Sequence, residues 1–159
     1  MINNNFLTHY LERLENLHLG ISTAIQNLPS EAMDWVPGPE MNSPAVLLAH
    51  TAGSLRYWIG DVALGDPAGR DREREFQTRG MSGADLLRRL DDVLAYARTA
   101  LPQLRLEDLE KVRQIAKDGE DVTCGWALLH ALEHASLHLG HIQLTCQLWK
   151  EKSTASQPE

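Results

Sequence analysis

The sequence predicts an all-α protein, and specifically a four-helix bundle. Three observations support this prediction. Four long segments place apolar residues three and four positions apart, and residues that favour helix starts and stops bound these segments. No stretch alternates apolar and polar residues between turn signals, as a strand would. Long amphipathic helices joined by loops bury their apolar faces against one another, which is the construction of a bundle.

The first predicted helix runs from Asn4 to Leu28 and ends before Pro29. Its apolar residues recur on one face, at Leu7, Leu11, Leu14, Leu17, Ile21, Ile25 and Leu28. The following residues 30–42, SEAMDWVPGPEMN, contain two prolines and a glycine. Because these residues disfavour regular structure, this stretch is predicted to be a connection.

The second predicted helix begins at Ser43, which is followed by Pro44, and reaches Gly65. A serine that caps the first turn, with proline at the first helical position, is a favoured helix start. Residues 66–80, DPAGRDREREFQTRG, are dense in charge and are predicted to form a long solvated loop.

The third predicted helix runs from Ser82 to Leu101, and Asp85 gives its start a weak form of the capping box. A short helix is predicted near residues 106–111. The last helix is predicted to run from Thr123 to Lys150. We therefore expect one helical-bundle domain over residues 1–150 and a flexible polar tail over residues 151–159.

Composition excludes several classes of function. The chain has 159 residues, 43% of them hydrophobic, and a net charge of -7, which disfavours a surface for nucleic acid. No run of 18 or more apolar residues exists, and the N-terminus MINNNFLTHY lacks the features of a signal peptide. We expect a cytoplasmic protein that binds neither nucleic acid nor membranes.

The two cysteines are predicted to be small buried apolar groups. Cys124 and Cys146 lie 22 residues apart in the last predicted helix. At about 1.5 Å per residue they would stand roughly 33 Å apart, too far for a disulfide or a shared metal ion.

The last predicted helix contains a cluster of histidines that are candidate metal ligands. Its sequence HALEHASLHLGH places His130, His134, His138 and His141 within an arc of about 80°. Trp126, Leu137, Leu144 and Leu148 border or share this arc, so the histidines are predicted to face the apolar interior. Histidines four apart on a helix can bind one metal ion together.

Two histidines need a further ligand from elsewhere in the fold. His50 is the only histidine of the second predicted helix and is the candidate. His9 and His18 flank the apolar stripe of the first helix and are predicted to have solvent-facing or boundary roles. Because imidazole binds metal only when neutral, metal affinity is expected to fall as the pH drops through about 6.

Two motifs give the chain a family resemblance: WVPGPEMNSPAVLLAH in the first half and HASLHLGHIQL in the last helix. With these motifs, and over nearly its whole length, the chain resembles the DinB-like metalloprotein superfamily, which includes the YfiT-type proteins. The resemblance implies a four-helix bundle in up-down-down-up order, with His50, His134 and His138 as metal ligands. His141 stands where relatives often carry glutamine, and the resemblance assigns no role to His130.

This ligand set predicts one divalent metal ion per chain, with zinc or nickel favoured over iron or manganese. Three imidazoles leave a coordination position open, as in catalytic zinc sites. The resemblance implies a small-molecule substrate and two reactions: an S-transferase that activates a low-molecular-weight thiol, or a hydrolase that activates water. The alternative is a non-catalytic metal-binding stress or sensor protein. No general base is identified, since Asp61 and Glu133 are predicted to be ordinary surface or boundary charges.

The side of the last helix opposite its histidines is also apolar. Leu128, Leu132, Ala135, Leu139, Ile142 and Cys146 form this second stripe. A helix that is apolar nearly all round must be covered on both sides. If the histidine arc faces the core, the other stripe needs a separate cover. The short helix or loop before Thr123 is one candidate cover, and a second chain is the favoured one, so a homodimer through the last helix is predicted.

Overall fold

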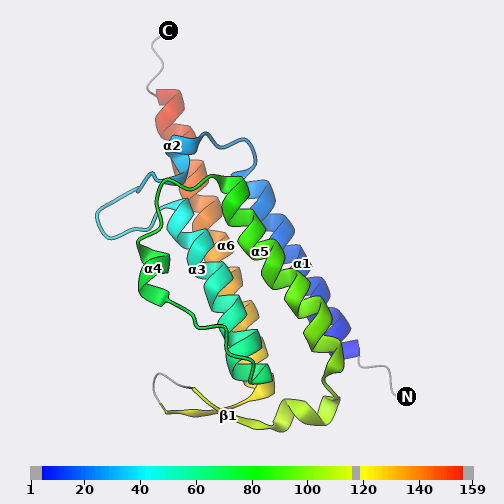
Figure 1. Ribbon diagram of the computed structural model, residues 1–159. Coiled ribbons are helices and arrows are strands. Elements are labelled where there is room, and N and C mark those ends of the chain that lie inside the picture. The colour runs from blue at the N-terminus through cyan, green and yellow to red at the C-terminus, as the bar shows by residue number, and fades with distance from the viewer. Residues whose placement is uncertain (1–4, 116–118, 156–159) are drawn as a thin grey trace.

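The computed structural model describes residues 5–115 and 119–155. It confirms the four-helix bundle (Figure 1). The long helices are α1 (Asn5–Ile25), α3 (Pro44–Arg56), α5 (Gly83–Ala100) and α6 (Cys124–Ala155), with a π-helical segment η1 (Tyr57–Leu64) continuing α3. None of the helices in the described ranges is both long and apolar enough to cross a membrane.

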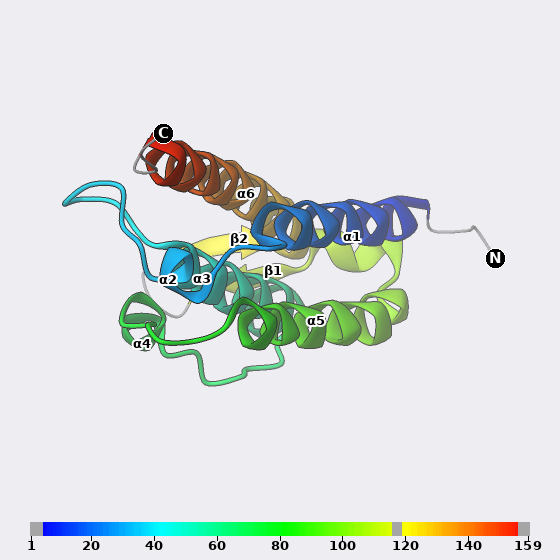
Figure 2. The same cartoon turned by 90° about the horizontal axis from the view of Figure 1, so that it is seen from above.

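The helices follow the up-down-down-up order that the resemblance implied. In Figure 1, α1 and α6 run upward while α3 and α5 run downward. α6 and α5 each lie against both α1 and α3. Figure 2 shows the same arrangement from above. Because α3 and α5 are parallel, a short turn cannot join them, and the chain between them returns along the bundle through α4 (Arg72–Phe76).

Three of the predicted helix starts, at Ser43, Ser82 and Thr123, are confirmed by a side-chain cap. The Val46 backbone N–H donates to Ser43 Oγ over 3.3 Å, and the Asp85 N–H donates to Ser82 Oγ over 3.1 Å. The Trp126 N–H donates to Thr123 Oγ1 over 3.1 Å. These bonds satisfy N–H groups that the first helical turn leaves without a backbone partner.

Two helix ends differ from the prediction. α1 ends at Ile25 rather than Leu28, because Asn27 takes a left-handed conformation with φ of 66°. Asparagine is one of the few residues that tolerate this helix-ending conformation. α6 continues five residues past Lys150 to Ala155, while Asn4 and residues 156–159 lie outside the described residues.

The connections contain short elements that the sequence pattern did not predict. These are α2 (Ser30–Met33), the helix α4, a 3₁₀ turn η2 (Leu101–Gln103) and an antiparallel pair of strands, β1 (Val112–Gln114) and β2 (Asp121–Thr123). The predicted short helix near residues 106–111 is present as the 3₁₀ segment η3 (Leu106–Glu110). Elements of three to five residues are too short to show a periodicity.

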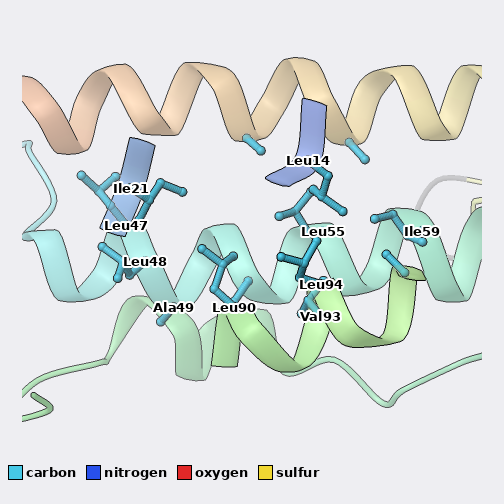
Figure 3. Close-up of a cluster of buried hydrophobic side chains, with 14 of the residues drawn as sticks. Leu14, Ile21, Leu47, Leu48, Ala49, Leu55, Ile59, Leu90, Val93 and Leu94 are labelled. Carbon is cyan, nitrogen blue, oxygen red and sulfur yellow. The ribbon is translucent and has the colours of Figure 1, made fainter. Parts of the chain in front are cut away.

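Helix α3 lies at the centre of the core. Eleven of its thirteen residues are buried, so it is covered on nearly every side. Figure 3 shows how Leu47, Leu48, Ala49 and Leu55 of α3 meet Leu14 and Ile21 of α1 and Leu90, Val93 and Leu94 of α5. His50 is part of this central helix, so the core fixes its position.

Both cysteines behave as predicted. Cys124 and Cys146 are free, buried thiols that are 0% and 3% exposed. Burial raises the pKa of each thiol, which keeps it protonated. Both thiols are therefore in the protonated, buried form that is chemically inert.

The prediction that the histidine face of α6 points into the core is wrong. The opposite face packs inside, with Ala127, Leu128, Ala135 and Ile142 each 0% exposed. The histidine side carries Leu137, which is 57% exposed. The small alanines explain why this face packs inside, because they let α6 approach its neighbouring helices closely.

This orientation also removes the argument for the dimer. Leu128, Ile142 and Cys146 of the second stripe are buried inside the same chain. Leu139 of the same stripe packs against Gly20 of α1, where an added Cβ would lie only 2.9 Å from Leu139 Cδ2. Helix α1 thus covers the stripe that was expected to need a second chain, and the stripe gives the predicted homodimer no support.

Truncation of Ile142 tests which face of α6 is the core. Ile142→Ala should lower the free energy of unfolding by about 2–4 kcal/mol, because it removes buried methyl groups and leaves a cavity. The exposed control Leu137→Ala should change it by less than about 0.5 kcal/mol. Urea unfolding of both variants measures the difference, and a larger loss for Leu137→Ala would contradict this orientation of α6.

Candidate metal centre

The structure brings together the three predicted ligand residues. His134 and His138 lie one turn apart on α6, with their Nε2 atoms 3.3 Å from each other. His50 reaches them from α3, with its ring centroid 5.1 Å from that of His134 and 5.0 Å from that of His138. One nitrogen from each residue lies within 4.8 Å of the others. Two neighbouring helices therefore build one cluster.

The cluster fits a divalent metal ion. Two nitrogens bound to one tetrahedral ion at about 2.0–2.1 Å stand roughly 3.3–3.4 Å apart, close to the 3.3 Å between the Nε2 atoms of His134 and His138. His138 Nδ1 is buried and has no hydrogen-bond partner in the described part of the chain. Nδ1 therefore does not fix the ring through a hydrogen bond, and the ligand role of His138 rests on its Nε2, which faces His134.

Burial keeps two of the three imidazoles neutral. It lowers the pKa of both His134 and His138 to about 4, and repulsion from neighbouring histidines adds to the effect. A neutral imidazole is the form that binds a metal ion. Protons compete for these two ligands at a lower pH than the value near 6 expected from an ordinary imidazole.

A buried carboxylate holds His50 in position. Glu75 Oε2 lies 2.8 Å from His50 Nδ1, and their side chains are 9% and 7% exposed. Since a carboxylate only accepts, Nδ1 carries the proton and donates it, which leaves Nε2 for the cluster. Arg70 donates to Glu75 through Nε over 2.7 Å and through a terminal NH2 group over 2.8 Å. That NH2 group also lies 3.3 Å from Nδ1, which already donates to Glu75 and so cannot accept from it.

Glu75 is ionised despite its burial. Burial alone raises its pKa, but hydrogen bonds from Arg70 and His50, and their charges, outweigh this effect and lower it. Gly53, on the turn after His50, makes room for the carboxylate, since an added Cβ there would collide with Glu75 Oε1. The carboxylate can therefore reach His50 only because position 53 is glycine.

Glu75 and Arg70 are the site residues that sequence reasoning missed. Both belong to the stretch 66–80 that was predicted to be a solvated loop; instead Glu75 is buried on the helix α4. Among the alternating charges of RDREREF, nothing in the pattern distinguishes the carboxylate that is buried. The observation that identifies it is its contact with α3.

The remaining histidines lie outside the cluster. His130 stacks on Trp126 at 5.0 Å between ring centroids, with the planes 5° apart. His141 is exposed and lies 5.6 Å from His138, measured between ring centroids. His9 pairs with Glu12 and is 68% exposed, and His18 pairs with Asp91 at 2.6 Å. These last two confirm the predicted solvent and boundary roles.

A cavity of about 510 Å³ adjoins the cluster. His50, Ser54, Tyr57, Trp58, Asp61, Arg70, Arg72, Ile115, His130 and His134 line it. Neither acidic candidate behaves as a general base. Asp61 lines the cavity but accepts from the Ala68 N–H over 3.0 Å and pairs with Arg56, and Glu133 is 83% exposed.

The fold and the cluster together define a class: an up-down-down-up helical bundle with a cluster of three histidines, two of which, His50 and His134, line a cavity. The chain belongs to the DinB superfamily, whose family model matches residues 14–142. No curated protein matches the chain. The family resemblance of the sequence is thereby confirmed.

Solved structures share the fold. YfiT from Bacillus subtilis, described as a probable metal-dependent hydrolase with an unusual four-helix bundle topology, superposes with a TM-score of 0.74 at 13% identity, over 92% of this chain and 89% of YfiT. A conserved protein from Enterococcus faecalis superposes with a TM-score of 0.71 at 20% identity, over 89% of this chain and 95% of its own. At these identities the likeness shows the fold alone.

Replacement of Glu75 tests whether it positions His50. Glu75→Gln should lower zinc affinity about 10- to 100-fold, because a neutral amide holds the His50 N–H less firmly. Glu73→Gln removes a nearby exposed charge on the same short helix and is the matched control. Competition with a chromophoric chelator measures both affinities. Equal affinities for the two variants would show that Glu75 has no positioning role.

The lowered pKa values predict how metal-free protein responds to acid. An unfolded histidine titrates near 6.5, so between about pH 6.5 and 4 the unfolded chain binds more protons than the folded chain at His134 and His138. Stability should therefore fall as the pH is lowered through this window. Urea unfolding at several pH values across the window measures this dependence.

A double variant identifies the source of this acid sensitivity. His134→Gln with His138→Gln should make the decline in stability shallower, because glutamine does not titrate. The exposed His9→Gln should leave the slope at its wild-type value. A double variant whose slope equals that of wild type would contradict the assignment.

Proposed function

We propose that this chain is an enzyme that uses one divalent metal ion, bound by His50, His134 and His138, to act on a small molecule. The observation that carries this proposal is the convergence of three imidazoles beside a cavity. A structural zinc site takes four protein ligands and is closed, whereas three ligands beside a cavity leave a position for a reactant. When bound, such an ion lowers the pKa of a water or thiol at that position.

The described residues supply binding and orientation for this reaction. Glu75 orients His50 through Nδ1, and burial keeps His134 and His138 in their neutral, metal-binding form. Trp58 and Arg72 offer an apolar and a cationic contact in the adjoining cavity. Neither Asp61 nor Glu133 is placed as a general base, so the proposal assigns activation of the nucleophile to the metal.

The proposed nucleophile is a low-molecular-weight thiol or water. The name of YfiT as a metal-dependent hydrolase supports water. The size of the cavity, about 510 Å³, supports a thiol together with an acceptor, since it is within the range of pockets that hold small organic ligands. Zinc and nickel are the first metals to test, followed by iron and manganese.

Metal content and two activity assays test the proposal. Purified protein should carry close to one divalent ion per chain by elemental analysis, and it should either conjugate a thiol to monochlorobimane or hydrolyse an activated ester. His50→Ala, His134→Ala or His138→Ala should each reduce the metal content to about a tenth and abolish the activity. His141→Ala is the control and should keep the metal.

Each outcome separates the candidates. Conjugation that depends on both metal and thiol identifies an S-transferase, and metal-dependent hydrolysis without thiol identifies a hydrolase. Bound metal without turnover in either assay would contradict the proposal that the chain is an enzyme, and would favour a metal-binding stress or sensor protein. Full metal content in His50→Ala would show that the ligand assignment is wrong.

A further inference from the structure

We infer that the cavity beside the histidine cluster binds an organic anion with a flat apolar body, whose charge pairs with Arg72 and whose flat part lies on Trp58. This inference rests on the proposed function, since it names the substrate class of the same site. It follows from the one charged side chain of the cavity lining, Arg72, that pairs with no carboxylate in the described ranges, and from the aromatic residues that also line the cavity.

The cationic and acidic groups of the cavity are paired, with one exception among the described residues. Arg70 makes two hydrogen bonds to Glu75. Asp61 is engaged by Arg56 and by the Ala68 N–H.

Arg72 is the exception, since no carboxylate in the described ranges pairs with it. Its guanidinium lies over the Phe76 ring at 4.8 Å from the centroid. Phe76 in turn packs on His50 with 4.8 Å between ring centroids. The Arg72 guanidinium is therefore separated from His50 of the cluster by a single aromatic ring, that of Phe76.

An unpaired cation beside this cluster favours an anionic ligand. The chain as a whole carries a net charge of -7, so the positive charge at this cavity is a local feature. A guanidinium binds a carboxylate or a phosphate through paired hydrogen bonds, which are stronger than bonds to neutral groups. A neutral ligand would gain less from Arg72 than an anion of the same shape.

Aromatic rings form another side of the cavity. Trp58 meets Tyr57, Trp126 and His130 edge to face, at 5.2, 5.7 and 4.4 Å between ring centroids. These contacts hold the indole in one orientation although it is only half-buried. A fixed indole surface favours a flat, apolar group over a flexible polar one.

Two probes of the same shape and different charge test the inference: 2-naphthoate and neutral 2-naphthamide. Binding is measured by equilibrium dialysis with chelator-treated, metal-free protein, so that the carboxylate cannot gain affinity from a metal ion. Wild-type protein should bind naphthoate about tenfold more tightly than naphthamide, as one charge-assisted pair predicts. Arg72→Gln should remove this preference and weaken naphthoate binding far more than naphthamide binding.

Two further variants separate local contacts from general effects. Arg74→Gln removes the same charge from the same short helix without touching the cavity lining, so it should keep the preference. Trp58→Leu should weaken both probes by about tenfold, because it removes the flat surface.

The inference is overturned if wild-type protein binds neither probe, or both equally. It is also overturned if the preference survives Arg72→Gln or is lost equally in Arg74→Gln. Because the assay uses metal-free protein, a positive result with no enzymatic turnover would reject the proposed function and leave the anion cavity in place.

Discussion

The hydrogen bond between Glu75 and His50 is the interaction on which the site depends. It joins the crossover segment to the central helix α3 and decides which nitrogen of His50 faces α6. Arg70 and Gly53 allow this bond to form inside the protein. Arg70 neutralises the charge of the buried carboxylate, and Gly53 leaves space for it. Without this network, a buried anion would be unpaired and His50 would be free to turn its ring.

The topology supplies the segment that carries Glu75. Because α3 and α5 run in parallel, the chain between them must travel the length of the bundle, and α4 packs against α3 on the way. The same return places Arg70 and Arg72 at the cavity. The π-helical segment η1 adds Tyr57 and Trp58 on another side, and widened helical turns of this kind are frequent at functional sites.

Helix α6 is apolar or aromatic on two faces that serve different purposes. Its alanines and Ile142 pack closely against the bundle, while His130 and His134 line a cavity at the edge of the core and His138 lies beside His134. This division explains why His134 and His138 are half-buried: they are dry enough for a pKa of about 4, yet open to a ligand. A fully buried cluster would be closed to substrate, and a fully exposed one would lose its ligands to protons at a higher pH.

Local hydrogen bonds and helical periodicity were enough to predict the four helices, their capped starts at Ser43, Ser82 and Thr123, and the shared face of His134 and His138. The family resemblance implied the order of the helices, and it assigned a ligand role to His50, which the sequence had already offered as the candidate third ligand. Which face of α6 packs in the core, and that Glu75 is buried, could be learned only from the packed helices. A helical wheel shows which residues share a face but not what covers it, and both facts depend on contacts between segments far apart in the chain.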